Sequence, residues 1–254
     1  MFHLAGYYES IDPSGAYAPI TAMDDQAIST DGDNIRISSS LPYIGGASFA
    51  TAAAVLTDAQ FRAPSLRTLN NLEIRPLVNA VTFGDPPQPM MFPRNPRSMT
   101  PAEDLQCWVD STPGAGAEAH YGLVWMTDGP LAQATGEMFT VGASSAATLV
   151  AGTWVNSNIT FNQTLPSGQY DILGMRAEGT NLLAGRLVFV GGGASSWRPG
   201  VPAVNANTDL DPEYFRFGGM GSYGTFDQDN PPSVELVGHT DNAQTLVFDL
   251  IKTG

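Results

Sequence analysis

The residues of this chain best suited to bind a metal ion are pairs of acids in short polar segments. Asp227 and Asp229 form the strongest pair, and segments 31–33 and 209–211 have the same spacing. Ca²⁺ takes about six to eight oxygen ligands, which carboxylate groups can supply. No segment has the spacing of an EF-hand loop, and Asp and Asn are also common in tight turns. We therefore expect no cofactor and keep Asp227 and Asp229 only as weak calcium candidates.

Catalytic motifs are absent or lack the sequence around them that their chemistry requires. Segment 219–224 has the glycine spacing of a dinucleotide-binding turn, but segment 225–232 contains two adjacent prolines and cannot form the helix that must follow. The three histidines, His3, His120 and His239, are too far apart to form a local metal-binding pattern. We predict that the protein is not an enzyme. The alternative, a β-sandwich hydrolase, would need two carboxylates about 5–10 Å apart in a groove.

Aromatic residues on loops are candidate contact sites for sugars or for other subunits. Trp197 and Arg198 lie on a long loop, and tyrosines occur at positions 7, 8 and 17 of a polar N-terminal segment. Trp, Tyr and Arg are favoured at protein interfaces, and flat rings can also stack on sugars. The interface candidates are Tyr7, Tyr8, Tyr17, Phe92, Trp197 and Arg198.

The second half of the chain consists of one short apolar run after another. We expect these runs to form the β-strands that position the candidate residues. The runs are rich in β-branched and aromatic residues, and Gly, Pro and Asn separate them, which is typical of an antiparallel sandwich or barrel. The predicted strands lie at 105–109, 121–127, 137–141, 148–151, 154–161, 169–176, 183–190, 214–217, 233–237 and 244–251.

The first hundred residues are less regular. Segment 1–34 is polar and rich in turn residues and reads as an arm, whereas the Ala-rich segment 46–56 is the best helix candidate. Segment 72–83 predicts a long strand, although Pro76 requires an edge position or a bulge. A proline-rich loop follows at 85–97. Thr100-Pro101-Ala102-Glu103 has the pattern of a capping box and predicts a short helical turn.

The net charge of −14 comes from scarce bases rather than from abundant acids. There are 25 Asp and Glu residues against 11 Lys and Arg, and Lys252 is the only lysine. Nucleic acids and anionic membranes are bound through clustered Lys and Arg. Segment 94–97 comes nearest to such a cluster and has two arginines. We therefore expect no direct nucleic-acid partner and no membrane insertion.

Other features of the sequence indicate in which cellular compartment the protein is made. No run approaches the roughly 20 apolar residues of a membrane helix, and the N-terminus lacks the basic and apolar regions of a secretion signal. Cys107 is the only cysteine, so no intrachain disulfide is possible, and we expect it to be a small buried apolar residue. We predict that the protein is made in a cytoplasm and stays there until an assembly is released.

In general organisation the chain resembles the jelly-roll coat proteins of icosahedral viruses. The short strands from residue 72 onward, the proline-rich loops and the tyrosine-bearing N-terminal segment carry this resemblance. It implies a jelly-roll β-sandwich over 72–254, preceded by an arm and a short helix over 1–71; the alternative is two small jelly rolls. Because a basic arm is lacking, the nearest relatives would be coats of bacterial or archaeal viruses whose shell overlies a membrane or another layer.

The resemblance implies a capsid subunit of a virion that is made in the host cytoplasm. It would assemble with itself through loops and the arm into trimers or larger shells, burying roughly 1,200–2,000 Å² per contact, and would meet other virion proteins. The alternative is a carbohydrate-binding β-sandwich, such as a receptor-binding domain of a phage tail or fibre. That function would need Trp197, Tyr214 or Tyr223 exposed on one face.

Overall fold

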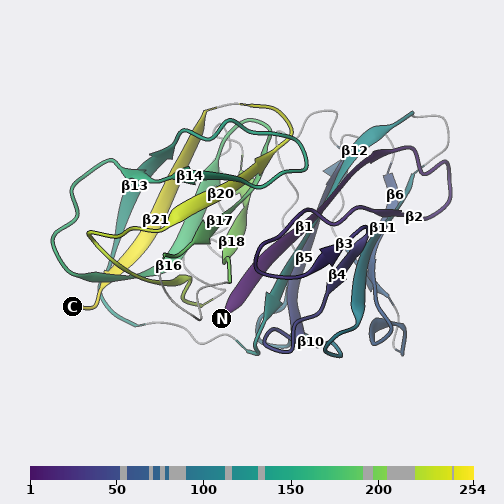
Figure 1. Ribbon diagram of the computed structural model, residues 1–254, viewed down its shortest axis with the longest axis horizontal. Helices are drawn as coiled ribbons and strands as arrows, with labels where there is room; N and C mark the ends of the chain where they lie inside the picture. The colour runs from purple at the N-terminus through teal and green to yellow at the C-terminus, as the bar shows by residue number, and fades with distance from the viewer. Residues whose placement is uncertain are drawn as a thin grey trace. The chain divides into compact units, whose positions relative to one another are not determined.

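The computed structural model describes residues 1–51, 56–68, 71–74, 78–79, 90–111, 116–130, 135–190, 197–204, 221–241 and 243–254. Within these ranges the chain is almost entirely β-strand, and the one helical segment is the 3₁₀ turn η1 (Leu66–Thr68). The strands form two compact units (Figure 1). The N-terminal unit is Ala5–Pro130, and the C-terminal unit is Leu131–Gly254 together with Met1–Leu4. The predicted all-β antiparallel fold is confirmed.

The N-terminal unit contains two sheets, each with six strands among the described residues. The first sheet consists of β1 (Phe2–Ile11), β5 (Tyr43–Thr51), β8 (Val78–Asn79), β9 (Met90–Met91), β10 (Arg97–Ser98) and β12 (Glu118–Thr127). The second consists of β2 (Ala18–Ile20), β3 (Thr30–Asp31), β4 (Asn34–Arg36), β6 (Leu56–Arg62), β7 (Leu72–Glu73) and β11 (Asp104–Ser111). Nearly all pairs are antiparallel, and β5 with β8 is a parallel exception.

The core of the N-terminal unit lies between these two sheets. The Tyr7 hydroxyl on β1 donates a hydrogen bond to the Leu105 carbonyl on β11 at 2.6 Å, and the Tyr7 and Phe61 rings are 5.7 Å apart. The Cys107 sulfur lies so close to Gly122 on β12 that a Cβ there would meet it at 2.7 Å. Glycine at position 122 therefore lets the two sheets approach each other.

Cys107 is fully buried in this core, as predicted. Burial raises the pKa of its thiol, because the apolar surroundings disfavour the thiolate. We expect the native protein not to react with a disulfide reagent at about pH 8, since the thiolate is the reactive form. After denaturation one thiol per chain should react at once. Rapid labelling of the native chain would show that the core around Cys107 is open.

The C-terminal unit contains one sheet of nine strands among its described residues. They are β13 (Met138–Ser145), β14 (Val155–Asn158), β15 (Thr160–Phe161), β16 (Gln169–Glu178), β17 (Leu182–Val188), β18 (Gly200–Val204), β19 (Gly224–Asp227), β20 (Ser233–Gly238) and β21 (Gln244–Lys252). The order is β14-β20-β17-β18-β16-β21-β13-β15, and β19 also pairs with β16. Tyr170, Phe226 and Phe248 are buried in its core.

Strands β11 and β5 show two different burial patterns. Along β11 the side chains alternate, with Leu105, Cys107 and Val109 buried and the residues between them at least partly exposed. Along β5 every residue from Ile44 to Thr51 is buried. Strand β11 therefore presents one face to solvent, and this face is described in the next subsection.

The helix predicted over 46–56 is wrong, because β5 covers residues 43–51 and β6 begins at Leu56. A run of mostly small and apolar residues suits a strand buried on both faces as well as a buried helix, and periodicity cannot separate the two. In the structure β5 pairs with β9 and packs closely against it, since a Cβ on Gly46 would meet the Met91 sulfur at 2.2 Å. Residues 52–55 lie outside the described ranges.

The helical turn predicted at 100–103 is replaced by a simple turn that leads directly into β11. The expected capping contact nevertheless forms, since the Glu103 carboxylate accepts a hydrogen bond from the Thr100 backbone N–H at 2.8 Å. Ala102 has a φ of 67°, which is outside the helical region and prevents a helix from continuing.

Residues 1–71 do not form a separate arm, because strands β1 to β6 lie within them and are built into the sheets. The boundary between the two compact units lies at Pro130/Leu131, and not at 71/72 as predicted. The polar composition of segment 1–34 suggested an arm, but the segment forms the long strand β1, the short strands β2 and β3, and the turns between them. None of the described helical segments is long and apolar enough to span a membrane.

Candidate functional site

A row of polar and aromatic side chains covers the exposed face of β11. Asp104, Gln106, Trp108 and Asp110 lie on this face, because alternate residues of a strand point the same way. The neighbouring strands place more polar residues beside them. We call the whole set the β11 face; it consists of Tyr17, Asp33, Asn34, Arg36, Asp58, Gln60, Arg62, Asp104, Gln106, Trp108 and Asp110.

The centre of the β11 face is a stack of three side chains. The Arg62 guanidinium carbon lies 4.2 Å from the centre of the Trp108 ring and 4.5 Å from the centre of the Tyr17 ring. The Tyr17 hydroxyl donates a hydrogen bond to the Asp58 carboxylate. Stacking of a guanidinium on aromatic faces contributes about 0.5–1 kcal/mol at exposed sites. These contacts fix the two rings and the guanidinium in one arrangement.

A hydrogen-bond network of side-chain amides and a carboxylate also holds Trp108. The Trp108 indole N–H donates to the Gln106 carbonyl Oε1 at 3.1 Å. The Gln106 amide Nε2 donates to Asp33 Oδ2 at 2.7 Å and to Asn34 Oδ1 at 3.1 Å. Trp108 is therefore oriented by hydrogen bonds as well as by stacking, and all of these side chains remain partly exposed.

Two carboxylates meet at one end of the face. Asp58 on β6 and Asp110 on β11 are direct cross-strand partners, next to a register shift at Asp110/Ser111. Residues opposite each other in this way have Cβ atoms about 4.5–5.5 Å apart, and like charges there are unfavourable. The Asp110 Oδ1 and the Arg62 Nε are buried and have no hydrogen-bond partner among the described residues. One buried polar atom at this end of the face, and one at its centre, therefore have no hydrogen-bond partner in the described part of the chain.

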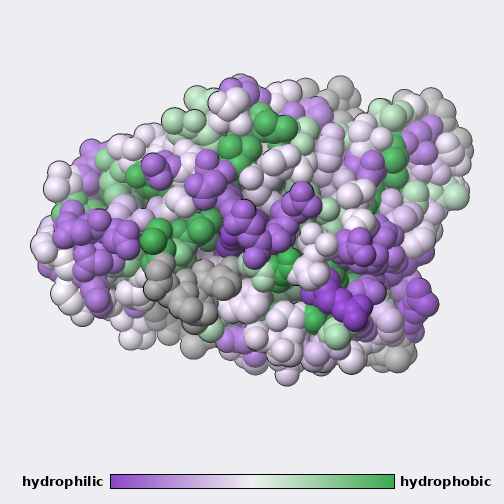
Figure 2. All heavy atoms as spheres, in the orientation of Figure 1, coloured by the Kyte–Doolittle hydropathy of each residue, from purple (hydrophilic) through white to green (hydrophobic). Residues whose placement is uncertain are grey.

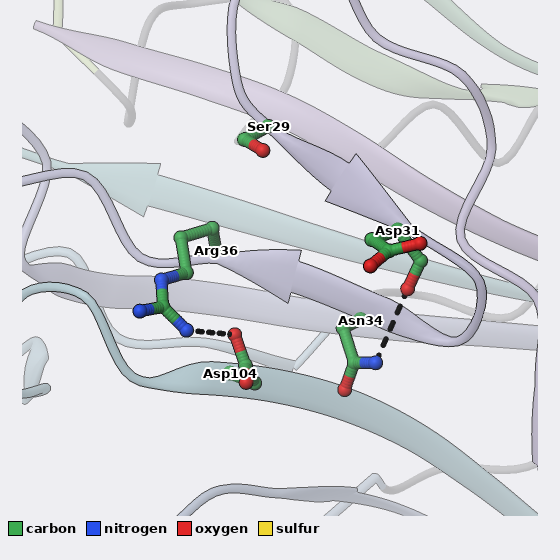
Figure 3. A pocket seen from close by; sticks show the side chains of 5 residues that line it. All are labelled: Ser29, Asp31, Asn34, Arg36 and Asp104. Atoms are coloured by element: carbon green, nitrogen blue, oxygen red, sulfur yellow. Dashed lines mark hydrogen bonds and ion pairs between the residues drawn. The ribbon is translucent and has the colours of Figure 1, made fainter.

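A small open depression of about 260 Å³ lies at the other end of the face. Ser29, Asp31, Asn34, Arg36 and Asp104 line it, and the Arg36 guanidinium pairs with Asp104 Oδ1 at 2.7 Å across it (Figure 3). Figure 2 shows hydrophilic residues gathered over β3 and β4, from which most of these side chains come. The paired carboxylates Asp58 and Asp110 are not part of this lining.

Burial and pairing shift the titration of the stacked groups. Partial desolvation, followed by the hydrogen bond to Asp58, raises the pKa of Tyr17 to about 12. Desolvation also lowers the pKa of Arg62. A tyrosine with this pKa is neutral at physiological pH and can keep donating its hydroxyl proton to Asp58.

A second cluster is buried in the C-terminal unit and holds the first residues of the chain. Arg186 on β17 donates from Nε to Glu235 Oε2 on β20 at 2.7 Å, and Arg198 Nη1 donates to both Glu235 oxygens at 2.6 and 2.8 Å. Arg186 Nη1 also donates to the Leu4 carbonyl at 2.8 Å. The Arg198 backbone N–H donates to His3 Nδ1 at 3.0 Å.

The buried cluster is a structural feature rather than a ligand site. Arg186 is fully buried, its guanidinium carbon lies 4.1 Å from the centre of the Trp154 ring, and Glu235 is 6% exposed. Two guanidinium groups share one carboxylate, and a backbone carbonyl completes the arrangement. Removing one partner from such a cluster leaves a buried charge uncompensated, which is costly. The N-terminal tetrapeptide is thereby fixed to the C-terminal unit.

The structure places the interface candidates of the first half in several environments. Tyr7 is fully buried in the core and therefore cannot contact another subunit in this fold. Tyr8 is half-buried, with its ring 4.6 Å from that of Tyr121. Phe92 is half-buried, and its backbone N–H donates a hydrogen bond to the Gly45 carbonyl on β5. Tyr17 belongs to the β11 face.

The candidates of the second half lie in the C-terminal unit. Trp197 is half-buried, with its ring 6.1 Å from the His3 ring, and Arg198 is 8% exposed because it belongs to the buried cluster. Tyr223, proposed for sugar stacking, is 4% exposed and packs against Phe2 at 5.0 Å. Tyr214 lies outside the described residues. Arg198 and Tyr223 are therefore not available on a surface.

The weak calcium candidates lie in a turn. Asp227 Oδ1 accepts a hydrogen bond from the Asp229 backbone N–H at 3.0 Å, which is the contact of an Asx turn. In the ranges that the structure describes, no group of three or more His, Cys, Asp or Glu residues is placed to hold a metal ion.

Sequence reasoning missed the β11 face, although one signal was present. Asp104, Gln106, Trp108 and Asp110 alternate with apolar residues, which indicates a half-exposed strand with these four on its open side. Arg62 and Tyr17 could not be assigned to the same place, because only the register between β6, β2 and β11 brings them there.

Comparison with known proteins adds no relative. No family model matches the chain, and no curated protein or solved structure matches it either.

Proposed function

We propose that this protein is a structural subunit of a virus capsid that assembles with copies of itself. The observation that carries the proposal is the construction of the chain from two compact all-β units of nearly equal length. The resemblance to jelly-roll coat proteins allowed for two small sandwiches in one chain, and this tandem supports that alternative. The subunit would be made in the host cytoplasm and would meet other virion proteins in the particle.

The C-terminal unit offers the surface for contacts between copies. The large hydrophobic side chains that are exposed among the described residues all belong to this unit; they are Met1, Met138, Val150 and Val190, at 38–63% exposure. Hydrophobic residues also reach its surface at several places in Figure 2. Burying apolar area is the main gain of association, about 25 cal/mol per Å². Since strands β1 to β5 of the first 51 residues are built into the sheets, these surfaces and the loops replace a free arm in the proposal.

Charge sets the conditions for assembly. Each copy carries a net charge of −14, so copies repel one another at low ionic strength. The screening length falls from about 30 Å at 0.01 M salt to about 8 Å at 0.15 M. We therefore expect the mean mass, measured by light scattering after size-exclusion chromatography, to rise with salt to at least three times the 26.9 kDa of one chain. A mass of one chain at every ionic strength would contradict the proposal.

A pair of variants tests where the copies meet. Val190→Asp adds a charge at an exposed apolar side chain of the C-terminal unit, and Ser39→Asp adds the same charge at an exposed position of the N-terminal unit. We expect Val190→Asp to shift the mass increase to higher salt, and Ser39→Asp to leave it close to that of the parent chain. Equal shifts would mean that net charge alone, and not this surface, controls association.

A further inference from the structure

The β11 face combines aromatic rings with side chains that both donate and accept hydrogen bonds. From Asp104 to Asp110 the row spans six residue steps, or about 20 Å at the rise of a β-strand. Along it the groups change from an ion pair, through an amide network, to the Tyr17–Arg62–Trp108 stack and a pair of carboxylates. A ligand that contacts the whole row must follow the direction of β11, so it must be extended.

We propose that the β11 face binds a neutral, extended glycan. Sugar hydroxyls donate and accept hydrogen bonds, and they match a surface that mixes carboxylates, amides and guanidinium groups. Arg62 covers one face of the Trp108 ring and one face of the Tyr17 ring, and the parts of these rings that remain exposed suit the apolar C–H faces of sugar rings. The exposed side chains of Arg36 and Asp104 and the partly exposed amides of Asn34 and Gln106 are the polar groups that ligand hydroxyls can reach.

Charge selects the class of glycan. The face carries Asp33, Asp58, Asp104 and Asp110 against two arginines, and each arginine already contacts groups of the face itself. Acids in excess disfavour polyanions, which include nucleic acids and acidic polysaccharides. A neutral polymer meets no such penalty.

The site is also organised before any ligand arrives. Trp108 is fixed by its hydrogen bond to Gln106 and by Arg62, so its side chain loses little freedom on binding. The depression at the Asp104 end, at about 260 Å³, is smaller than the roughly 300–1,000 Å³ pockets that enclose drug-sized ligands. It can therefore take one end or one branch of a longer chain rather than a whole ligand. This glycan site is independent of capsid assembly.

The test is native electrophoresis of the full chain in gels that contain a neutral polysaccharide, with a β-glucan, a galactomannan and starch as probes and hyaluronan as the acidic comparison. Retardation by at least one neutral polymer, without retardation by hyaluronan, is the expected result. Trp108→Ala should weaken that binding about tenfold or more, as for a central aromatic contact residue. Trp197→Ala, which removes a half-buried tryptophan of the C-terminal unit, should bind like the parent chain.

Tyr17→Ala at the edge of the stack serves as a second variant in case Trp108→Ala does not fold, and should weaken binding at least threefold. Circular dichroism of each variant establishes that it is folded. The proposal is overturned if no neutral polymer retards the parent chain, if hyaluronan alone does so, or if the folded β11-face variants bind as tightly as the parent.

Discussion

Glu235→Ala is expected to destabilise the C-terminal unit by about 3–5 kcal/mol, the cost of leaving a buried charge without its partner. Glu235 is the shared acceptor of Arg186 and Arg198, at N–O distances of 2.6–2.8 Å, and Arg186 is fully buried. Without the carboxylate, two guanidinium groups repel each other inside the unit. Urea unfolding of the parent and variant chains, followed by circular dichroism, measures the difference.

The chain offers a matched control in another ion pair. Arg36 and Asp104 are also 2.7 Å apart, but their side chains are 52% and 47% exposed. Because solvent screens such pairs, Asp104→Asn should change stability by no more than about 0.5 kcal/mol. Equal effects of Glu235→Ala and Asp104→Asn would mean that the cluster around Glu235 is open to water.

The second large effect concerns the first residues of the chain. Leu4 is fully buried and belongs to the C-terminal unit, although that unit otherwise begins at Leu131. Its backbone N–H donates to the Arg198 carbonyl at 2.9 Å. Leu4→Ala should therefore cost about 2–5 kcal/mol, as buried Leu→Ala changes do, and the loss should appear far along the sequence. Hydrogen exchange should increase in β17, β18 and β20.

Tyr8→Ala is the matched control, four residues further along β1. The Tyr8 ring packs on Tyr121, and its backbone N–H bonds to the Thr21 carbonyl, both in the N-terminal unit. Hydrogen exchange of the Tyr8→Ala variant should increase in β12 and β2 and remain unchanged in β17 and β20. If Leu4→Ala instead increases hydrogen exchange in the N-terminal unit, residues 1–4 do not belong to the C-terminal unit.

Much of the strand content could be predicted because it depends on local pattern. The run at 105–109 alternates between buried and exposed residues and became β11, and the runs at 169–176 and 244–251 became β16 and β21. Segment 46–56 failed because local pattern cannot separate a strand buried on both faces from a buried helix. The predicted boundary at 71/72 differs from the division at Pro130/Leu131, because long-range strand pairing sets the division, as it does the placement of Met1–Leu4.

The candidate site was less predictable than the fold. Single residues such as Trp197 stand out in a sequence because of their type, but exposure decides whether they can bind anything. Trp108 lies beside Arg62 and Tyr17 because Arg62 is on β6 and Tyr17 directly precedes β2, and both strands pair with β11. Those partners are 46 or more positions away, so only the register of the sheet could reveal them.

Imaging of the assembled protein tests the central proposal most directly. At an ionic strength that gives the highest mass by light scattering, negative-stain electron microscopy should show closed shells, or flat arrays of uniform repeat built from the same subunit. Fields that contain isolated particles of one-chain size at every salt concentration, with no array or shell, would contradict a capsid role.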